Sequence, residues 1–326
     1  MQIFKSPNFN FIRWRWHALG LSALVVLGGL AMIISRGGVP LGIDFSGGTI
    51  VIVKFDRPVS DDALRTALQS IPGDKVLQQY GESGENSWLI RLPQTEAREQ
   101  GVSLEEDSNR VFAALKTAGM PSFEVVSTEI VGPVIGADLQ RKGIYATLAS
   151  MVAITIYIAF RFRVSFALGS IVATLHDIFV TLACLVLFNY DLSLNIVAAM
   201  LTMVGYSVND MIVIFDRVRE NARLQRRESL ETMINTSLNQ TLSRTIITSG
   251  TVFLAVLALF VFGGEVLEGF AFTMLAGTVA TTYSGWFIAP SIAIMLGSRK
   301  VAARAVPASA PQPSRSRTKS RNAKAS

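Results

Sequence analysis

The sequence is short of the side chains on which most enzymes and disulfide-rich scaffolds depend. Only 17% of its 326 residues are charged, whereas a soluble domain usually carries about a quarter. Its one cysteine, Cys184, excludes an intramolecular disulfide and a cysteine-based metal site. There are two histidines and no glycine-rich phosphate-binding loop, so few groups are available for metal, acid–base or nucleotide chemistry. We therefore expect no catalytic residues, no bound metal and no cofactor.

Hydrophobic residues, in contrast, make up 50% of the chain. An apolar stretch of about 20 residues is long enough to cross a bilayer as a helix. Six stretches reach or approach this length: 17–35, 143–160, 165–188, 194–215, 245–262 and 270–296. The sequence therefore predicts a polytopic α-helical membrane protein with six transmembrane helices.

The first apolar stretch could be a cleaved signal peptide or a permanent anchor. Arg13 and Arg15 precede it, as basic residues do in a signal peptide. However, the stretch is long for such a peptide. It is followed by Ser-Arg-Gly-Gly (35–38) and not by an Ala-x-Ala cleavage site. We expect an uncleaved anchor.

Lysine and arginine residues predict the orientation in the inner membrane. With a cytoplasmic N-terminus, they fall before the first helix, after the second, between the fourth and fifth, and after the sixth. The short outer loops 189–193 and 263–269 contain none. Cytoplasmic loops are enriched in basic residues. Both termini are therefore expected in the cytoplasm, and topology rather than nucleic-acid binding explains the net charge of +6.

This topology divides the chain into four parts. Residues 1–36 hold the cytoplasmic N-terminus and the first helix, and residues 37–138 lie in the periplasm. Residues 139–298 hold the other five helices, with a cytoplasmic amphipathic helix expected in the loop 217–239. The tail 299–326 is basic and rich in Pro, Ser and Ala, so we expect it to be disordered and attracted to anionic membrane lipid.

The periplasmic segment is long enough to fold by itself. Its patterns predict strands at 49–55, 75–80, 87–92 and 123–131 and capped helices at 60–71 and 103–115. The order β-α-β-β-α-β is typical of a ferredoxin-like α+β domain. Such a domain could bind a peptide at its sheet edge, or it could be a spacer.

Asp210 and Arg244 are ionisable residues expected inside the membrane, where such groups are costly and often functional. Asp210 lies about 8 Å below the cytoplasmic surface in the fourth helix, with Tyr206 and Ser207 one turn away and Asn209 adjacent. Arg244 begins the antiparallel fifth helix at a similar depth. It could therefore pair with Asp210 if the two helices are neighbours.

Asp177 lies near the middle of the third helix, beside His176. It belongs to a polar stripe with helical spacing, which we expect to face protein or water: Ser170, Thr174, Asp177 and Thr181. His176 is the weaker candidate, because helical geometry rotates it by about 100° from Asp177.

Structural roles remain the alternatives for these residues. Arg244 could extend to the lipid headgroups, Asp210 could tie helices together, and Asp177 could serve packing alone. Small polar residues continue through the last two helices, including Thr248 and the stripe Gly269, Thr273, Gly277 and Thr281. This stripe predicts close helix packing and could also be a seam with a partner subunit.

Residues 41–49 read LGIDFSGGT, directly after the first apolar stretch. They resemble the Gly-Ile-Asp-Phe-x-Gly-Gly motif of the SecD/SecF family, part of the RND superfamily. Residues 131–136 (VGPVIG) are similar to its Val-Gly-Pro element, and residues 175–177, 205–221 and 239–245 resemble the SecF members in particular. The motif residues that we carry over from the first element are Gly42, Asp44, Gly47 and Gly48. The resemblance extends over residues 10–298.

The resemblance implies half of a twelve-helix unit, completed by SecD. It further implies association with the SecYEG channel and YajC, and use of proton flow to assist the late export of preproteins. The family's proton-coupling aspartate and arginine correspond to Asp210 and Arg244. We expect Asp177 to contribute, and helices one and two to relay the movement to the outer domain.

Two other functions fit the same topology. A half-size RND exporter of small molecules would need a large apolar substrate pocket. A non-transporting structural subunit of the translocon would use its buried charges only to hold helices together. We expect such a scaffold to tolerate a charge swap of Asp210 and Arg244, and a proton carrier not to.

Overall fold

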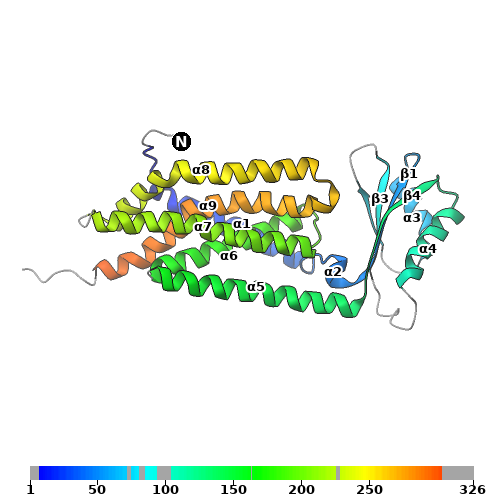
Figure 1. The fold of residues 1–326 in the computed structure, drawn as a ribbon, viewed down its shortest axis with the longest axis horizontal. Coiled ribbons are helices and arrows are strands. Elements are labelled where there is room, and N and C mark those ends of the chain that lie inside the picture. Colours follow the sequence, from blue (N-terminus) through cyan, green and yellow to red (C-terminus); the bar gives the residue numbers. More distant parts are fainter. Residues whose placement is uncertain are drawn as a thin grey trace, which may run out of the picture.

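The computed structural model describes residues 7–71, 75–80, 85–93, 104–162, 164–224 and 228–302. Long helices form an elongated bundle, and a small α+β domain stands at one end of it (Figure 1). In chain order the elements are η1 (Ile12–Trp14), α1 (Arg15–Ser35), α2 (Ile43–Ser46), β1 (Gly48–Phe55), α3 (Asp61–Ala67), β2 (Val76–Tyr80), β3 (Ser87–Pro93), α4 (Leu104–Thr117), β4 (Phe123–Val131), α5 (Pro133–Arg161), α6 (Val164–Leu187), α7 (Leu194–Leu224), α8 (Leu230–Phe262) and α9 (Glu265–Ala302).

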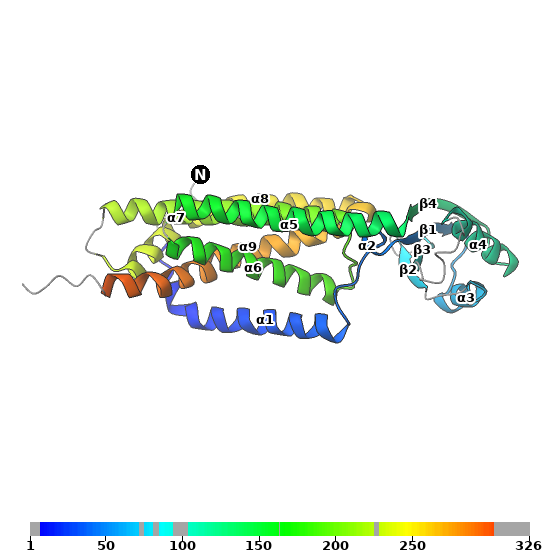
Figure 2. The same cartoon turned by 90° about the horizontal axis from the view of Figure 1, so that it is seen from below.

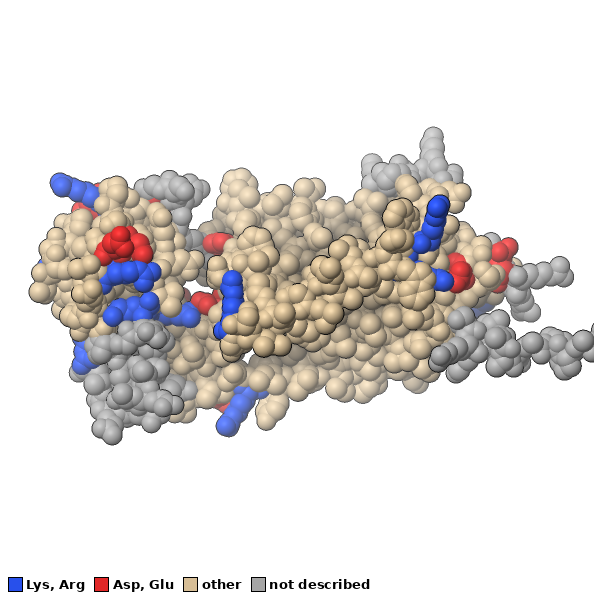
Figure 3. Space-filling view, turned by 180° about the vertical axis from the view of Figure 1, so that it is seen from behind, with Lys and Arg blue, Asp and Glu red and all other residues tan. Residues whose placement is uncertain are grey.

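The composition of the bundle confirms the predicted fold class. Six helices in the described part of the chain (α1 and α5 to α9) are long and apolar enough to cross a membrane. Charged side chains gather at the two ends of the molecule, and the flank of the bundle between them is largely free of charge (Figure 3). We call the end with the α+β domain the domain end. The opposite end, with η1, the α7–α8 turn and the end of α9, is the basic end.

Helix α9 occupies the centre of the bundle and packs against α6, α7 and α8. Close packing depends on small residues: a Cβ atom on Gly169 of α6 would lie 2.6 Å from the Ala289 carbonyl oxygen of α9. Residues Gly269 and Gly277 of α9 face Ile196 and Met203 of α7 in the same way. The small-residue stripe is therefore used within the chain, and the expectation of a seam with a partner is wrong.

The outer helices are packed less tightly. Helix α1 lies along α6 and α9 as part of the bundle. Helix α5 lies at the edge of the bundle (Figure 2), where it contacts α2, α6 and α7. Most of its apolar side chains are exposed. In a membrane these side chains would face lipid or another subunit.

The domain has the ferredoxin-like arrangement that the element order predicts. Its antiparallel sheet has the order β2-β3-β1-β4, with Val51 of the central strand β1 opposite both Ile90 and Thr128. Helices α3 and α4 cover one face, where buried apolar side chains from both layers form the core: Val51, Val53, Leu64, Leu68, Ile90, Val111 and Leu115. The Ser60 hydroxyl accepts a hydrogen bond from the Ala63 amide (3.3 Å) and caps α3.

The helices at the basic end are longer than the apolar stretches. Residues 217–239 were expected to form an amphipathic helix of their own. Instead, α7 continues to Leu224 and α8 begins at Leu230, so the segment consists of extensions of two membrane helices. Hydropathy shows where a helix leaves the apolar layer. The helix itself continues until its backbone hydrogen bonding stops, and this need not be the same position. Similarly, α9 continues to Ala302, so the first four residues of the expected tail, 299–302, are helical, and the rest of it, residues 303–326, lies outside the described part.

Candidate functional site

Asp210 lies on α7 where this helix meets α8 and α9. Its side chain is 7% exposed, and its Oδ1 accepts a hydrogen bond from the Thr245 hydroxyl of α8 (3.3 Å). Within the described structure the buried Oδ2 has no hydrogen-bond partner. This oxygen points toward Gly285 of α9, where a Cβ atom would lie 3.9 Å from it. A buried carboxylate oxygen without a donor is costly, and protonation of the carboxyl group would lower this cost.

Arg244 does not form the expected ion pair with Asp210. The two carboxylate oxygens have only Thr245 as a partner in the described structure, and Arg244 is exposed on α8. Successive helical residues are rotated by about 100°, so the inward position of Thr245 places Arg244 outward. The guanidinium charge acts on Asp210 only through space.

Three predicted supporting residues also differ from expectation. Asn209 is exposed, and Thr248 is exposed and donates to its own backbone at the Arg244 carbonyl (2.9 Å). The Tyr206 hydroxyl donates to Ser249 on α8 (2.9 Å) and not to Asp210. These contacts fix the α7–α8 packing and leave Asn209 and Arg244 on the surface of the isolated chain.

Asp177 is fully buried at the centre of α6. The Ser207 hydroxyl of α7 donates to its Oδ2 (2.7 Å), and Ser284 of α9, whose hydroxyl donates to the Thr281 carbonyl (3.2 Å), lies near its carboxylate. The His176 Nδ1 lies 3.2 Å from its Oδ1, so the expectation that His176 points away from Asp177 is wrong. Asp177 is thus held by α6, α7 and α9 together.

Helices α7 and α9 connect the two carboxylates. Ser207, which binds Asp177, lies three residues before Asp210, a rise of about 4.5 Å. On α9, Ser284 lies near Asp177 while the next residue, Gly285, lies beside Asp210. A change of charge at either aspartate therefore acts on the same turns of α7 and α9.

Replacing Ser207 by alanine tests how firmly Asp177 is held. Because the change removes a donor from a fully buried carboxylate, we expect a loss of about 1–3 kcal/mol of unfolding free energy. The matched control is Ser170→Ala on α6, whose buried hydroxyl donates only to its own helix at the Phe166 carbonyl (3.1 Å). Unfolding of the two detergent-purified variants would be compared, and an equal loss in both would contradict a special role for the Ser207 contact.

The glycine-rich motif forms a junction between the domain and the α6–α7 loop (188–193). The Leu192 amide donates to the Pro40 carbonyl and the Gly42 amide donates to the Leu192 carbonyl, both at 2.8 Å. A Cβ atom on Gly42 would lie 3.0 Å from the Leu192 carbonyl oxygen, so the approach needs glycine. We call this contact, together with the two side-chain contacts below, the domain junction.

Asp44 attaches the motif to α7. Its Oδ2 accepts a hydrogen bond from the Leu194 amide (2.8 Å), the first residue of the helix that carries Asp210. A carboxylate at a helix N-terminus satisfies a free amide and interacts favourably with the helix dipole. Gly47 and Gly48, with φ of 70° and 132°, then turn the chain from α2 into β1.

Arg91 of β3 completes the junction from the sheet. Its side chain is 13% exposed, forms an ion pair with Asp191 of the α6–α7 loop, and donates to the Leu41 carbonyl (3.3 Å). Burial raises the pKa of Asp191, while the Arg91 charge opposes this shift. A hundred positions separate the two residues, so no local sequence pattern predicts that they pair. The one signal was an acidic residue in a short outer loop without basic residues.

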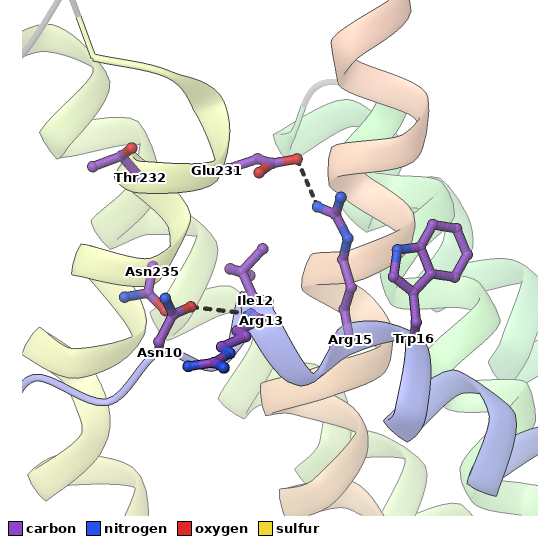
Figure 4. Close-up of a pocket in the computed structure, with 8 residues that line it drawn as sticks. All are labelled: Asn10, Ile12, Arg13, Arg15, Trp16, Glu231, Thr232 and Asn235. Atoms are coloured by element: carbon purple, nitrogen blue, oxygen red, sulfur yellow. Dashed lines mark hydrogen bonds and ion pairs between the residues drawn. The ribbon is translucent and has the colours of Figure 1, made fainter.

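A polar hollow of about 430 Å³ at the basic end holds the N-terminal segment against α8 (Figure 4). Arg15 forms an ion pair with Glu231 (2.6 Å), and the Asn10 Oδ1 accepts from the Arg13 amide (3.0 Å). Just beyond it, Asn239 exchanges two hydrogen bonds of 2.8 Å with the Phe9 backbone. Because its polar groups largely satisfy one another, the hollow has a structural role. The described residues contain no cluster of His, Cys, Asp or Glu suited to a metal ion.

Comparison with protein families gives two matches along the chain. Residues 111–299 match the family described as protein export membrane protein SecD/SecF, C-terminal, and residues 34–59 match the SecD/SecF GG motif. The second range contains the motif residues of the domain junction.

Individual relatives are similar over most of their length. The protein translocase subunit SecF of Escherichia coli O157:H7 is 38% identical over 293 residues, which cover 90% of this chain and 89% of that protein. The SecF subunit of Rhodothermus marinus is 39% identical over 316 residues, covering 93% and 98%. The crystal structure of SecDF, a translocon-associated membrane protein from Thermus thermophilus, matches with a TM-score of 0.78 and 32% identity. It aligns with 90% of this chain, which spans 39% of that longer one.

Proposed function

The chain belongs to the SecD/SecF family of protein-export membrane proteins, and from this membership we propose that it is a SecF subunit that couples proton movement across the inner membrane to late steps of preprotein export. The observation that carries the coupling part is the buried Asp210, which has one oxygen held by Thr245 and the other without a donor. A proton supplied from the periplasm would neutralise this carboxylate and change its contacts with α8 and α9.

The proposed orientation places both termini in the cytoplasm and residues 37–138 in the periplasm. It is supported by the basic residues at the end of the bundle opposite the domain, including Arg217, Arg219 and Arg223. Export substrates emerge on the periplasmic side, so this orientation gives the ferredoxin-like domain access to them. The domain would act on the emerging preprotein from there.

The proposed partner within the membrane is SecD, with the SecYEG channel, YajC and membrane lipid around the unit. Arg244 and Asn209 support such a partner, because both are exposed at membrane depth and would be costly against lipid. A related SecDF chain is much longer than this one, as expected if this chain supplies one part of a larger unit. Arg244 would then reach Asp210 or a SecD group only in the assembled complex.

Movement could pass to the domain by three connections. Helix α1 leads into the motif and β4 leads into α5, which are the two connections that the sequence indicates. The domain junction adds a third, because Asp44 binds the first residue of α7. Since α7 also carries Asp210, protonation and domain position are connected through one helix.

Depletion of the protein tests the proposed function as a whole. Inner-membrane vesicles depleted of this subunit should complete preprotein export more slowly, and the deficit should be largest when a proton gradient is present. Adding a protonophore should remove most of the difference, because gradient-driven work is what the subunit contributes. A deficit unchanged by the protonophore would favour the structural subunit over the proton-coupled one.

A further inference from the structure

A pocket of about 710 Å³ at the basic end is not used by the proton site. It lies where the C-terminal ends of α5 and α7 meet the N-terminal end of α8. Three arginines line it: Arg161, Arg219 and Arg223. Its floor is made of buried apolar side chains: Phe162, Phe166, Val218 and Met233. A cationic rim above an apolar floor fits a ligand that has an anionic head and a hydrocarbon part.

The pocket lies at the level where lipid headgroups meet hydrocarbon. Phe160, the last apolar residue of α5, is 95% exposed beside the pocket, and Arg161 ends the helix immediately after it. Helix α6 begins at Val164 and returns into the apolar layer. A lipid could therefore place its chains against Phe160 while its headgroup enters the pocket.

The charges around the pocket are unbalanced. Asp216 forms an ion pair with Arg161 (2.9 Å) and a longer one with Arg219 (4.0 Å), so two guanidinium groups share one carboxylate. Asp216 does not itself line the pocket, and among the described lining residues Glu228 is the acidic one. Arg223 is exposed and has no carboxylate partner among the described residues. The hollow of Figure 4 differs, since its Arg15 is already paired with Glu231.

We propose that this pocket binds the phosphate headgroup of an anionic phospholipid from the cytoplasmic leaflet. Arg219 and Arg223 would contact the phosphate, because a guanidinium group donates two parallel hydrogen bonds to phosphate oxygens. Basic pockets between transmembrane helices on the cytoplasmic side are suited to acidic lipid headgroups. Such a lipid links the ends of α5, α7 and α8, and so strengthens the attachment of the loosely packed α5.

The test measures lipid binding by the detergent-purified full chain, using native mass spectrometry with added lipids. Phosphatidylglycerol should bind more tightly than phosphatidylcholine with the same acyl chains, and inorganic phosphate should bind far more weakly because it lacks those chains. Arg223→Gln should weaken phosphatidylglycerol binding about fivefold, and Arg219→Gln with Arg223→Gln about thirtyfold. Ala222→Phe, which fills the pocket without a change of charge, should also weaken it.

The matched control is Arg217→Gln, which makes the same charge change on the same helix. Arg217 does not line the pocket and is bound to Glu220 and Gln240 (both 2.6 Å), so phosphatidylglycerol binding should be unchanged. Equal binding of the two lipids, or an equal loss in the Arg217 variant, would overturn the proposal. Inorganic phosphate binding as tight as lipid binding would assign the site to a soluble anion and would overturn it too.

Discussion

Replacing Asp210 by asparagine is expected to abolish proton-dependent stimulation of preprotein export while the subunit still assembles with SecD. Asparagine keeps the size of the side chain and can still accept the hydrogen bond from Thr245. It cannot take up a proton, so the change of charge at the α7–α9 contact no longer occurs. Export would be measured in reconstituted vesicles with and without a proton gradient, and the ratio of the two rates should fall to about one.

The control for this substitution is Asp216→Asn, an identical chemical change further along α7. Asp216 lies at the basic end, where it is partly exposed and paired with Arg161 (2.9 Å). Stimulation should therefore persist in this variant. Normal stimulation with Asp210→Asn, or an equal loss with Asp216→Asn, would disprove the assignment of the proton site.

The structure also changes how the scaffold alternative is tested. A charge swap of Asp210 and Arg244 was expected to distinguish a scaffold from a proton carrier. Because the two side chains do not contact each other in the chain, the swap would bury an arginine without a partner and damage either kind of protein. Asp210→Asn is the cleaner discriminating change, since it leaves packing in place.

The second large effect is expected at the domain junction. Arg91→Ala removes an ion pair and the hydrogen bond to the Leu41 carbonyl, which should cost about 1–3 kcal/mol because the pair is partly screened by solvent. The backbone contacts of Gly42 and Leu192 should then open more often. Hydrogen exchange of these two amides should accelerate roughly tenfold or more, and gradient-driven export should fall.

Two controls distinguish a loss of movement transmitted through the domain junction from a general loss of stability. Exchanging the charges, with Arg91→Asp and Asp191→Arg together, should restore part of the protection. Arg65→Ala removes an exposed ion pair within α3 of the same domain, where both partners are about half exposed, and should change neither exchange nor export. If Arg91→Ala accelerates exchange but leaves stimulation intact, the junction is structural and does not transmit movement.

Acidification gives an independent check of the same contact. Burial raises the pKa of Asp191, so its carboxylate should be protonated at a higher pH than that of an exposed aspartate. Because this pKa is higher in the closed junction than in solvent, the closed junction binds a proton more tightly than the open one, and acidification favours the closed state. Protection of the Leu192 amide, corrected for the intrinsic pH dependence of exchange, should therefore increase on mild acidification in the native protein, and should be insensitive to pH in Asp191→Asn.

The fold was predictable from local signals because hydropathy and strand periodicity are both local. The six apolar stretches correspond to the membrane helices, and the element order of residues 48–131 predicts the β2-β3-β1-β4 sheet. The ends of α7 and α8 were not predictable from hydropathy, since both helices continue past the apolar layer. The short helix α2 within the glycine-rich motif was also missed.

The depth of the site residues along their helices was predictable from the sequence, but the direction in which their side chains face around the helix axis was not. Counting residues places Asp210 and Arg244 at similar depths, yet which face of α8 turns inward depends on packing with α9. Thr245 faces inward, so Arg244 faces outward. Likewise, ideal helical geometry separates His176 from Asp177, but side-chain rotation brings Nδ1 to 3.2 Å from the carboxylate.

The way the ferredoxin-like domain is attached restricts how it can turn. The chain connects the domain to the bundle at two points. One connection runs from α1 through the motif, and the other runs from β4 directly into α5. A body held at two points can swing about the line through them, and a third contact off that line stops the swing. The Arg91–Asp191 pair is such a third contact, contributed by β3 rather than by either connection, so its release should leave the domain held more weakly against rotation while both connections stay in place.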